Sequence, residues 1–204
     1  MSTLTRQSAR TTWVALRSMA LLTILLGVVY TVTITLIGQL LLPAQANGSL
    51  VRDDDGQVAG SALIGQNFAD ADGAPLPEYF QPRPSAAGDG YDGGASSGSN
   101  YGPENEELIA MITERRTQIS RFNGVAESAV PADAVTASSS GLDPHISPEY
   151  AAIQVARIAD ARSLSVTDVR TLLDAHTRGR EFGFLGSPTV NVLELNVALD
   201  SARG

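Results

Sequence analysis

The sequence contains no cysteine and no lysine among its 204 residues. Without cysteine, disulfide bridges, thiolate metal sites and cysteine nucleophiles are excluded. Without lysine, Schiff-base chemistry and the phosphate-binding loop G-x-x-x-x-G-K-[ST] are excluded. The 14 basic residues are therefore all arginine, and 22 acidic residues bring the formal net charge to −8. Such an acidic chain is a poor nucleic-acid binder, because basic side chains that neutralise phosphates supply most of the affinity of proteins for nucleic acids.

The charges are unevenly distributed along the chain. Residues 1–17 contain three arginines and no acidic residue, which leaves 22 acidic residues against 11 arginines, or −11, in the remainder. From Met19 to Leu42 there is no charged residue over 24 positions. At about 1.5 Å per residue this run makes roughly 36 Å of helix, and the hydrocarbon core of a bilayer is about 30 Å thick. The sequence therefore predicts a transmembrane helix over residues 19–42, ended by Pro43.

Two other interpretations of the apolar run remain open. A buried helix of a soluble protein is rarely uncharged over such a length. A cleaved signal peptide fits the preceding arginines and the small residues of "PAQA" (Pro43–Ala46), but its apolar region is usually about 7–15 residues long. We therefore expect an uncleaved anchor. Four threonines in the run are compatible with lipid, because a helical threonine hydroxyl can bond to a carbonyl one turn earlier.

The arginines also predict the orientation. Positive charge beside a span stays cytoplasmic, so we expect a cytoplasmic arm over residues 1–18 and an extracytoplasmic domain over residues 43–204. The expected location is the bacterial inner membrane, crossed once, in contact with membrane lipid.

The outer domain begins with irregular sequence. Residues 43–102 are rich in Gly, Pro, Ser, Asn and Asp, with short strands expected only at Val58–Ile64 and around Phe68. The stretch from Gln81 to Asn100 has the composition of a linker or disordered loop. Its unusual motifs are equally typical of a packed loop that belongs to this domain.

The second half of the domain is predicted to be mainly helical. A helix is expected from Pro103 to Gly124, followed by an extended piece after Pro131 and a loop. Ser147 and Ser165 are expected to cap two more helices, the first with a stripe of small residues at Ala152, Val155, Ala156 and Ala159 and the second ending near Gly179. A strand at Thr189–Val192 and a final helix complete the prediction. The fold class is thus α+β, with three or four helices and few short strands, behind a single transmembrane helix.

The sequence gives no constructive case for an enzyme. His145 lies in a predicted loop, and His176 lies near a helix end, where a protonated imidazole complements the helix dipole. Two histidines about 30 residues apart are weak evidence for a metal site. The run Asp53–Asp55 precedes a glycine and is typical of a solvated turn. We expect no catalytic residue, no metal ligand and no cofactor of its own.

Six motifs, in order, resemble one family. They are "QANGSLV" (Gln45–Val51), "GSALIGQNF" (Gly60–Phe68), "YFQPRPS" (Tyr79–Ser85), "ASSGSN" (Ala95–Asn100), "VTASSSGLDPHISP" (Val135–Pro148) and "VNVLELNVALD" (Val190–Asp200). Together they resemble the C subunit of the bacterial Kdp potassium-transporting ATPase over nearly the whole chain. The family often has His-Gly before "RPS", where this chain has Gln81 and Pro82.

The resemblance implies an accessory subunit without a catalytic site of its own. Its implied partners are a channel-like potassium-binding A subunit, a P-type ATPase B subunit and a small F membrane peptide. It also implies a catalytic chaperone that raises the ATP affinity of the B subunit, with ATP bound jointly and Gln154 as the nucleotide contact. Further motif residues are the implied partner-facing candidates: Gly60, Ser61, Gln66, Asn67, Arg83, Pro84, Ser85, Gly141 and Asp143.

The charge pattern and the implied nucleotide contact conflict. ATP is cytoplasmic, whereas the arginines predict that residues 43–204 lie on the other side of the membrane. We therefore favour a domain that caps the channel-like subunit. An anchored binding module unrelated to transport and a secreted enzyme with a cleaved leader remain as alternative classes.

Overall fold

The computed structural model describes residues 3–202, which divide into two compact units between Ser49 and Leu50. The first unit is helical. It consists of α1 (Thr3–Ile24), a π-helical segment η1 (Leu25–Tyr30), α2 (Thr31–Leu41) and the short α3 (Pro43–Ala46). The predicted stop at Pro43 is confirmed, because α2 ends at Leu41 and Pro43 is the first residue of α3.

The long helix has the length and composition of a membrane span. Within the 34-residue stretch Ser8–Leu41, an apolar segment of 18 residues has a mean hydropathy of 2.4. Thr33 donates its hydroxyl hydrogen to Val29 O at 2.7 Å, and Thr31 donates to Leu26 O at 3.3 Å. The second bond reaches five residues back, as the π-helical segment requires. These threonines therefore satisfy their hydroxyl groups within the helix.

The second unit begins with a hairpin of β1 (Leu50–Arg52) and β2 (Val58–Ser61), whose antiparallel register pairs Leu50 with Ser61. The acidic run Asp53–Asp55 forms its exposed turn, as predicted. A second sheet has the strand order β3-β5-β4, all antiparallel. Its strands are β3 (His145–Ile146), β4 (Thr177–Arg178) and β5 (Thr189–Asn191).

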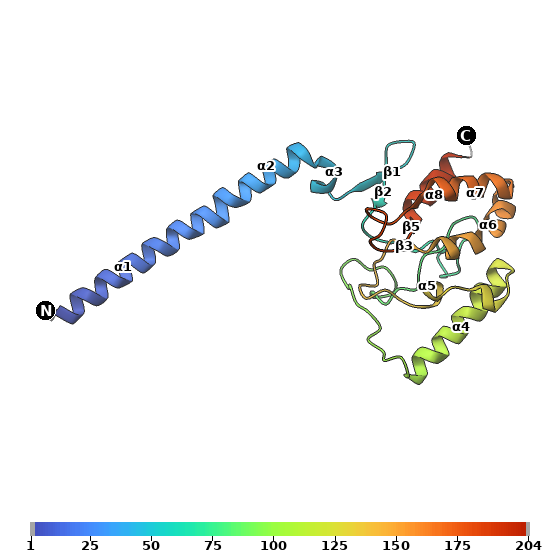
Figure 1. The fold of residues 1–204 in the computed structure, drawn as a ribbon, viewed down its shortest axis with the longest axis horizontal. Helices are drawn as coiled ribbons and strands as arrows, with labels where there is room; N and C mark the ends of the chain where they lie inside the picture. The colour runs from blue at the N-terminus through green and yellow to red at the C-terminus, as the bar shows by residue number, and fades with distance from the viewer. Residues whose placement is uncertain (1–2, 203–204) are drawn as a thin grey trace. The chain divides into compact units, whose positions relative to one another are not determined.

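Four longer helices accompany this sheet, in agreement with the predicted α+β class, and α6 and α8 contact β5. They are α4 (Glu106–Asn123), α6 (Pro148–Arg162), α7 (Val166–Ala175) and α8 (Val192–Ser201). Figure 1 shows α6, α7 and α8 close together, with α4 and the short α5 (Ala132–Val135) beside α6. A 3-10 turn, η2 (Glu127–Ala129), follows α4. Ser147 and Ser165 are the predicted caps, since their side chains accept hydrogen bonds from Tyr150 N and Asp168 N.

Two predicted boundaries are wrong. α4 begins at Glu106 and not at Pro103, because the side chain of Asn105 accepts a hydrogen bond from Leu108 N at 3.0 Å and so caps the helix there. α7 ends at Ala175, before Gly179, with His176 as its C-cap. The segment after Pro131 was predicted to be extended but forms the helical turn α5. Its Asp133 accepts hydrogen bonds from the backbone and hydroxyl of Ser147, which fixes the turn against the start of α6.

The predicted small-residue face of α6 is also partly wrong. Ala152 and Ala156 are exposed, whereas the buried face includes Ala151, Gln154 and Ile158. The polar residue Gln154 occupies a core position on this helix. A prediction based only on small apolar side chains therefore rotated the buried face of α6 by about one residue. The core that α6 shares with α8, β5 and Phe80 is otherwise mostly aliphatic, with Tyr150 of α6 as a further aromatic side chain.

Residues 81–100 are not a free linker. Phe80 and Ala87 have no exposed surface, and Gln81 is 8% exposed. The interpretation of this segment as a packed loop is confirmed. A buried stretch without regular structure must find partners for its backbone groups, and those partners define the candidate site.

Candidate functional site

Two amide side chains hold the irregular segment at Phe80 and Gln81. Asn196 on α8 accepts a hydrogen bond from Phe80 N at 2.9 Å and donates one to Phe80 O at 3.0 Å. Gln154 on α6 accepts from Gln81 N at 2.7 Å and donates to Gln81 O at 3.2 Å. Each amide therefore pairs with one residue as a neighbouring β-strand would. The segment is held like a strand although no strand lies beside it.

Two arginines of α6 hold the residues just before it. Arg157 donates to Pro77 O and, at 3.1 Å, to Tyr79 O. Arg162 donates to Glu78 O at 2.6 Å and forms an ion pair with Asp200 at 2.8 Å. Burial lowers the pKa of Arg157 to about 10. We call Gln154, Arg157, Arg162 and Asn196 the backbone clamp.

The clamp determines the environment of Gln154, the predicted nucleotide contact. This side chain has no exposed surface. Its Oε1 also accepts a hydrogen bond from Arg157 Nη2 at 2.9 Å. Both ends of the amide therefore have protein partners. The contact of Gln154 with a nucleotide stays a prediction.

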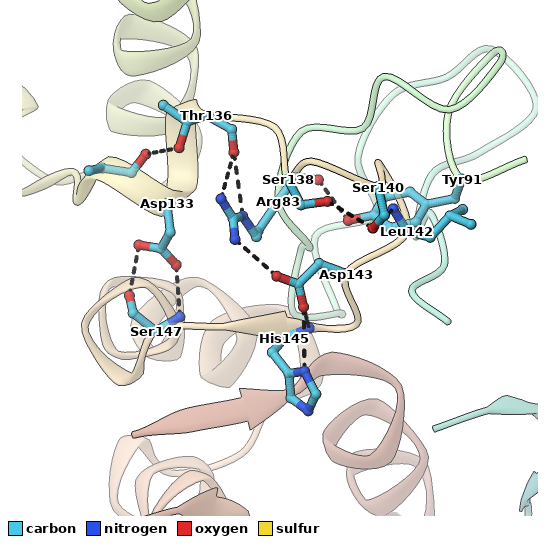
Figure 2. Close-up of polar contacts among 11 residues, drawn as sticks. Arg83, Tyr91, Asp133, Thr136, Ser138, Ser140, Leu142, Asp143, His145 and Ser147 are labelled. Atoms are coloured by element: carbon cyan, nitrogen blue, oxygen red, sulfur yellow. Dashed lines mark hydrogen bonds and ion pairs between the residues drawn. The ribbon is translucent and has the colours of Figure 1, made fainter. Parts of the chain in front are cut away.

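An ion pair joins the two loops that carry "RPS" and "GLD" (Figure 2). Arg83 Nη1 lies 2.9 Å from Asp143 Oδ2. The other carboxylate oxygen accepts a hydrogen bond from His145 N at 2.9 Å and lies 3.4 Å from His145 Nδ1. Burial by itself would raise the pKa of Asp143, but the hydrogen bonds from His145 and the positive charge of Arg83 outweigh it. The pKa of Asp143 is therefore lowered.

A second set of contacts joins the same loops through Ser85. Its hydroxyl donates to Gly141 O at 2.7 Å and accepts from Tyr91 N at 2.8 Å. Tyr91 in turn donates its hydroxyl hydrogen to Arg83 O at 2.8 Å. Gly141 has φ +68°, and a Cβ at this position would lie 2.6 Å from Ser97 O. The glycine is thus required both for its conformation and for the close approach of the second loop.

The candidates near the hairpin have a different role. Gln66 donates its amide to Ala59 O at 2.8 Å across the base of the hairpin. A Cβ on Gly60 would lie 2.0 Å from that amide nitrogen, so the glycine makes room for it. The hydroxyl of Ser61 accepts a hydrogen bond from Leu63 N. These three residues shape the start of the second unit and lie apart in sequence from the loop pair.

Four of the candidates line one pocket. Asn67, Arg83, Pro84 and Ser85 border a hollow of about 260 Å³, which is also lined by Arg115 and other residues of α4. The pocket brings together motifs far apart in sequence. Gln154 does not line it, although its partner Gln81 does.

Sequence reasoning missed three of the four clamp residues, Arg157, Arg162 and Asn196. A signal for Asn196 was present. The buried positions of α8 include Val192, Leu195 and Leu199, and Asn196 falls on the same face. A single amide on an otherwise apolar helix face indicates a hydrogen-bond partner in the core, because buried polar groups are nearly always hydrogen-bonded. The arginines offered no such signal: Arg162 is buried and Arg157 is half-buried, although arginine is usually exposed.

Among residues 3–202 no group of three or more His, Asp and Glu side chains could hold a metal ion. The arrangement consists of fixed loops, a glycine at a close approach and a pocket lined partly by one of these loops.

Comparisons with known proteins identify the family. The family model described as "KdpC: K+-transporting ATPase, c chain" matches residues 12–201. The potassium-transporting ATPase KdpC subunit of Kineococcus radiotolerans is 55% identical over 177 residues, covering 87% of this chain and 86% of that protein. The corresponding subunit of Caulobacter vibrioides is 54% identical over 188 residues, with 92% and 91% covered. That of Mycobacterium tuberculosis is 51% identical over 187 residues, with 91% and 95% covered. The chain therefore belongs to the KdpC family, the c chain of the K+-transporting ATPases.

Proposed function

We propose that this chain is a non-catalytic accessory subunit that caps the channel-like subunit of the potassium pump from the extracytoplasmic side. Its relatives are named as subunits of a potassium-transporting ATPase, which supports potassium import as the shared activity. The proposed partners are the channel-like A subunit, the P-type B subunit and the small F peptide. The helix over Ser8–Leu41 anchors the chain in the cell membrane.

The proposed side of the membrane rests on charge. Arg6, Arg10 and Arg17 precede the apolar run and keep the N-terminus cytoplasmic. The sequence has no cysteine, so a single introduced cysteine is the only thiol of the chain. Labelling of this thiol tests the orientation directly. In intact cells, a membrane-impermeant maleimide should label Asp54→Cys in the exposed hairpin turn and should not label Ser8→Cys until the cells are lysed. The reverse pattern would contradict the proposed orientation.

The observation that best supports a role without nucleotide is the engagement of Gln154. Its amide is buried and bonded at both ends to the chain. A nucleotide contact would require those bonds to break, at a cost of about 1–3 kcal/mol for each buried group left without a partner. We therefore propose that Gln154 acts within the fold. The alternative, a chaperone that binds ATP jointly with the B subunit, requires Gln154 to act on the nucleotide directly.

Asn196 provides a matched control that separates these two roles. It is as buried as Gln154 and makes the same pair of bonds to the neighbouring residue, Phe80. We expect Gln154→Ala and Asn196→Ala to lower the stability of the subunit to a similar degree. The KM for ATP of the purified, fully assembled pump should be the same for both variants.

A raised KM for ATP with Gln154→Ala alone, in complexes of full subunit composition, would contradict the proposal and support the chaperone role. Because Gln154→Ala also leaves a cavity, Gln154→Glu should be measured in parallel. It keeps the size and one acceptor but loses the donor to Gln81 O.

A further inference from the structure

The loop between β4 and β5 presents large apolar side chains to solvent. Phe182 is 86% exposed, Phe184 is 70% exposed and Leu185 is 49% exposed. Full burial of such a side chain contributes about 1.5–3 kcal/mol. Three of them on one short loop could therefore stabilise a contact with an apolar partner substantially. Apolar side chains gathered in this way mark an interaction site more often than scattered ones do.

The loop holds these side chains in a defined conformation. Glu181 and Leu185 pair through two backbone hydrogen bonds, Glu181 N to Leu185 O at 3.0 Å and Leu185 N to Glu181 O at 2.9 Å. Between them, Phe182 has φ +51° and Gly183 has φ +82°. A left-handed phenylalanine is unfavourable, and here it lies at the tip of a closed turn. The turn thus displays the aromatic rings instead of folding them onto the core.

The charge of this loop differs from that of its surroundings. Residues 177–189 contain Arg178, Arg180 and Glu181, a balance of +1, whereas residues 18–204 together carry −11. Arg178 pairs with Glu194 at 2.7 Å and remains 60% exposed. Both arginines thus lie just before the apolar tip in the sequence, within an acidic domain.

A second group of exposed apolar residues lies at the start of the same unit. Leu63 is 65% exposed and Leu50, the first residue of the unit, is 49% exposed. The loop leads into β5, whose last residue, Asn191, donates its side-chain amide to Ala62 O at 2.8 Å. Figure 1 likewise shows β5 and β2 in the same part of the unit. The aromatic loop thus belongs to the part of the unit where the chain enters from the long helix.

We propose that the tip formed by Phe182, Phe184 and Leu185 inserts into the interface of the lipid bilayer and holds the second unit against the membrane. The inference rests on the proposed membrane anchor, but not on the side of the membrane that the domain occupies. Only residues 42–49 separate α2 from the second unit, and eight residues reach at most about 29 Å. The tether therefore keeps this unit close to the bilayer surface.

The composition of the tip favours lipid over a protein partner. Aromatic rings next to an arginine such as Arg180 suit the headgroup region, where the rings enter the acyl boundary and the guanidinium group meets phosphate. A stable protein interface buries about 1,200 Å² or more, far beyond what three side chains on a narrow turn supply. A bilayer needs only a few inserted side chains, because the span already supplies most of the attachment.

Tryptophan fluorescence of the full-length chain tests this insertion. The chain has one tryptophan, Trp13, so Trp13→Phe provides a silent background. Into it are placed Phe182→Trp, Phe184→Trp as a second tip variant, Val166→Trp at an exposed position of α7, and Tyr30→Trp within the apolar helix. Each variant is reconstituted into phosphatidylcholine–phosphatidylglycerol vesicles with or without bromine on the acyl chains.

We expect brominated lipid to quench Phe182→Trp and Phe184→Trp by about threefold or more, relative to Val166→Trp, because interfacial insertion reaches about 5–10 Å into the bilayer. Quenching of Tyr30→Trp with both tip variants no more quenched than Val166→Trp would overturn the inference alone. Failure to quench Tyr30→Trp would instead overturn the proposed anchor. A blue shift of the tip variants that occurs only in the assembled pump, without lipid quenching, would assign the tip to a protein partner and also overturn the inference.

Discussion

At the scale of single residues, polar side chains supply the backbone hydrogen-bond partners that helices and sheets supply elsewhere. A buried backbone N–H or C=O without a partner is costly, and the chain around Phe80 has no strand beside it. Gln154 and Asn196 replace that strand, each with one donor and one acceptor. Arg157 and Arg162 donate hydrogen bonds to the three preceding carbonyl groups, those of Pro77, Glu78 and Tyr79.

The ion pair of Arg83 and Asp143 predicts a pH dependence of stability. The folded pKa of Asp143 lies below its ordinary value of 3.8. Its contribution is therefore complete above that value and is lost as the pH falls through the folded pKa. We expect the difference in unfolding free energy between the native chain and Asp143→Asn to shrink as the pH is lowered from neutral to about 3. Denaturant titrations of the full-length chain in detergent would measure it.

Asp54→Asn, in the exposed hairpin turn, is the matched control for removal of one carboxylate. If the native chain and Asp143→Asn differed equally at both pH values, the ion pair and its hydrogen bonds would not be the source of the acid sensitivity.

At the scale of elements, the loops are as constrained as the helices. The loop with Ser85 and the loop with Gly141 are joined by a hydroxyl, a carbonyl and an ion pair. Tyr91, with φ +58°, is kept in an unfavourable conformation by bonds at both its N–H and its hydroxyl. Strained residues of this kind persist only where the surroundings determine them fully. The loop pair is thus held in one conformation.

Gly141→Ala tests how closely the two loops must approach. The new Cβ would lie 2.6 Å from Ser97 O and 2.7 Å from Ala87 N, at φ +68°. We expect a loss of about 2 kcal/mol or more in unfolding free energy, because backbone atoms must move and the conformation is unfavourable. Gly102→Ala, where no atom lies within 4 Å of the new Cβ, should change stability by only about 0.5 kcal/mol. Equal effects would show that the approach of the loops is not limiting.

At the scale of the whole molecule, charge separates the two ends of the chain. The arm before the span is basic, and the domain after it is strongly acidic. A field from the exposed Asp53–Asp55 turn would favour cations, but screening confines it to about 8 Å at physiological salt. It can act on potassium only if this turn lies beside the pore entrance of the channel-like subunit.

Reversal of the three charges at Asp53–Asp55 should therefore weaken the apparent potassium affinity of the pump at low ionic strength, with the difference fading as salt is added. Replacement of all three by glutamate keeps the charge and is the control. Transport assays in cells or proteoliposomes would measure the affinity. An unchanged affinity at low salt would remove the steering role while leaving the capping role intact.

The sequence by itself determined the features that depend on local order. The apolar run sets the long helix, Pro43 ends it, and the caps at Ser147 and Ser165 start two helices, because each of these effects acts within one turn of the chain. The ordered motifs likewise identified the family.

The tertiary structure decided everything that depends on partners far apart in sequence. Residues 81–100 have the composition of a linker, yet Asn196, 116 residues from Phe80, helps to bury the segment that precedes them. Ala152 is exposed because the buried face of α6 runs through Ala151, Gln154 and Ile158. Secondary-structure propensity depends on residues that are neighbours along the chain. The position of a buried polar group depends instead on its hydrogen-bond partner, which can be far away in the sequence.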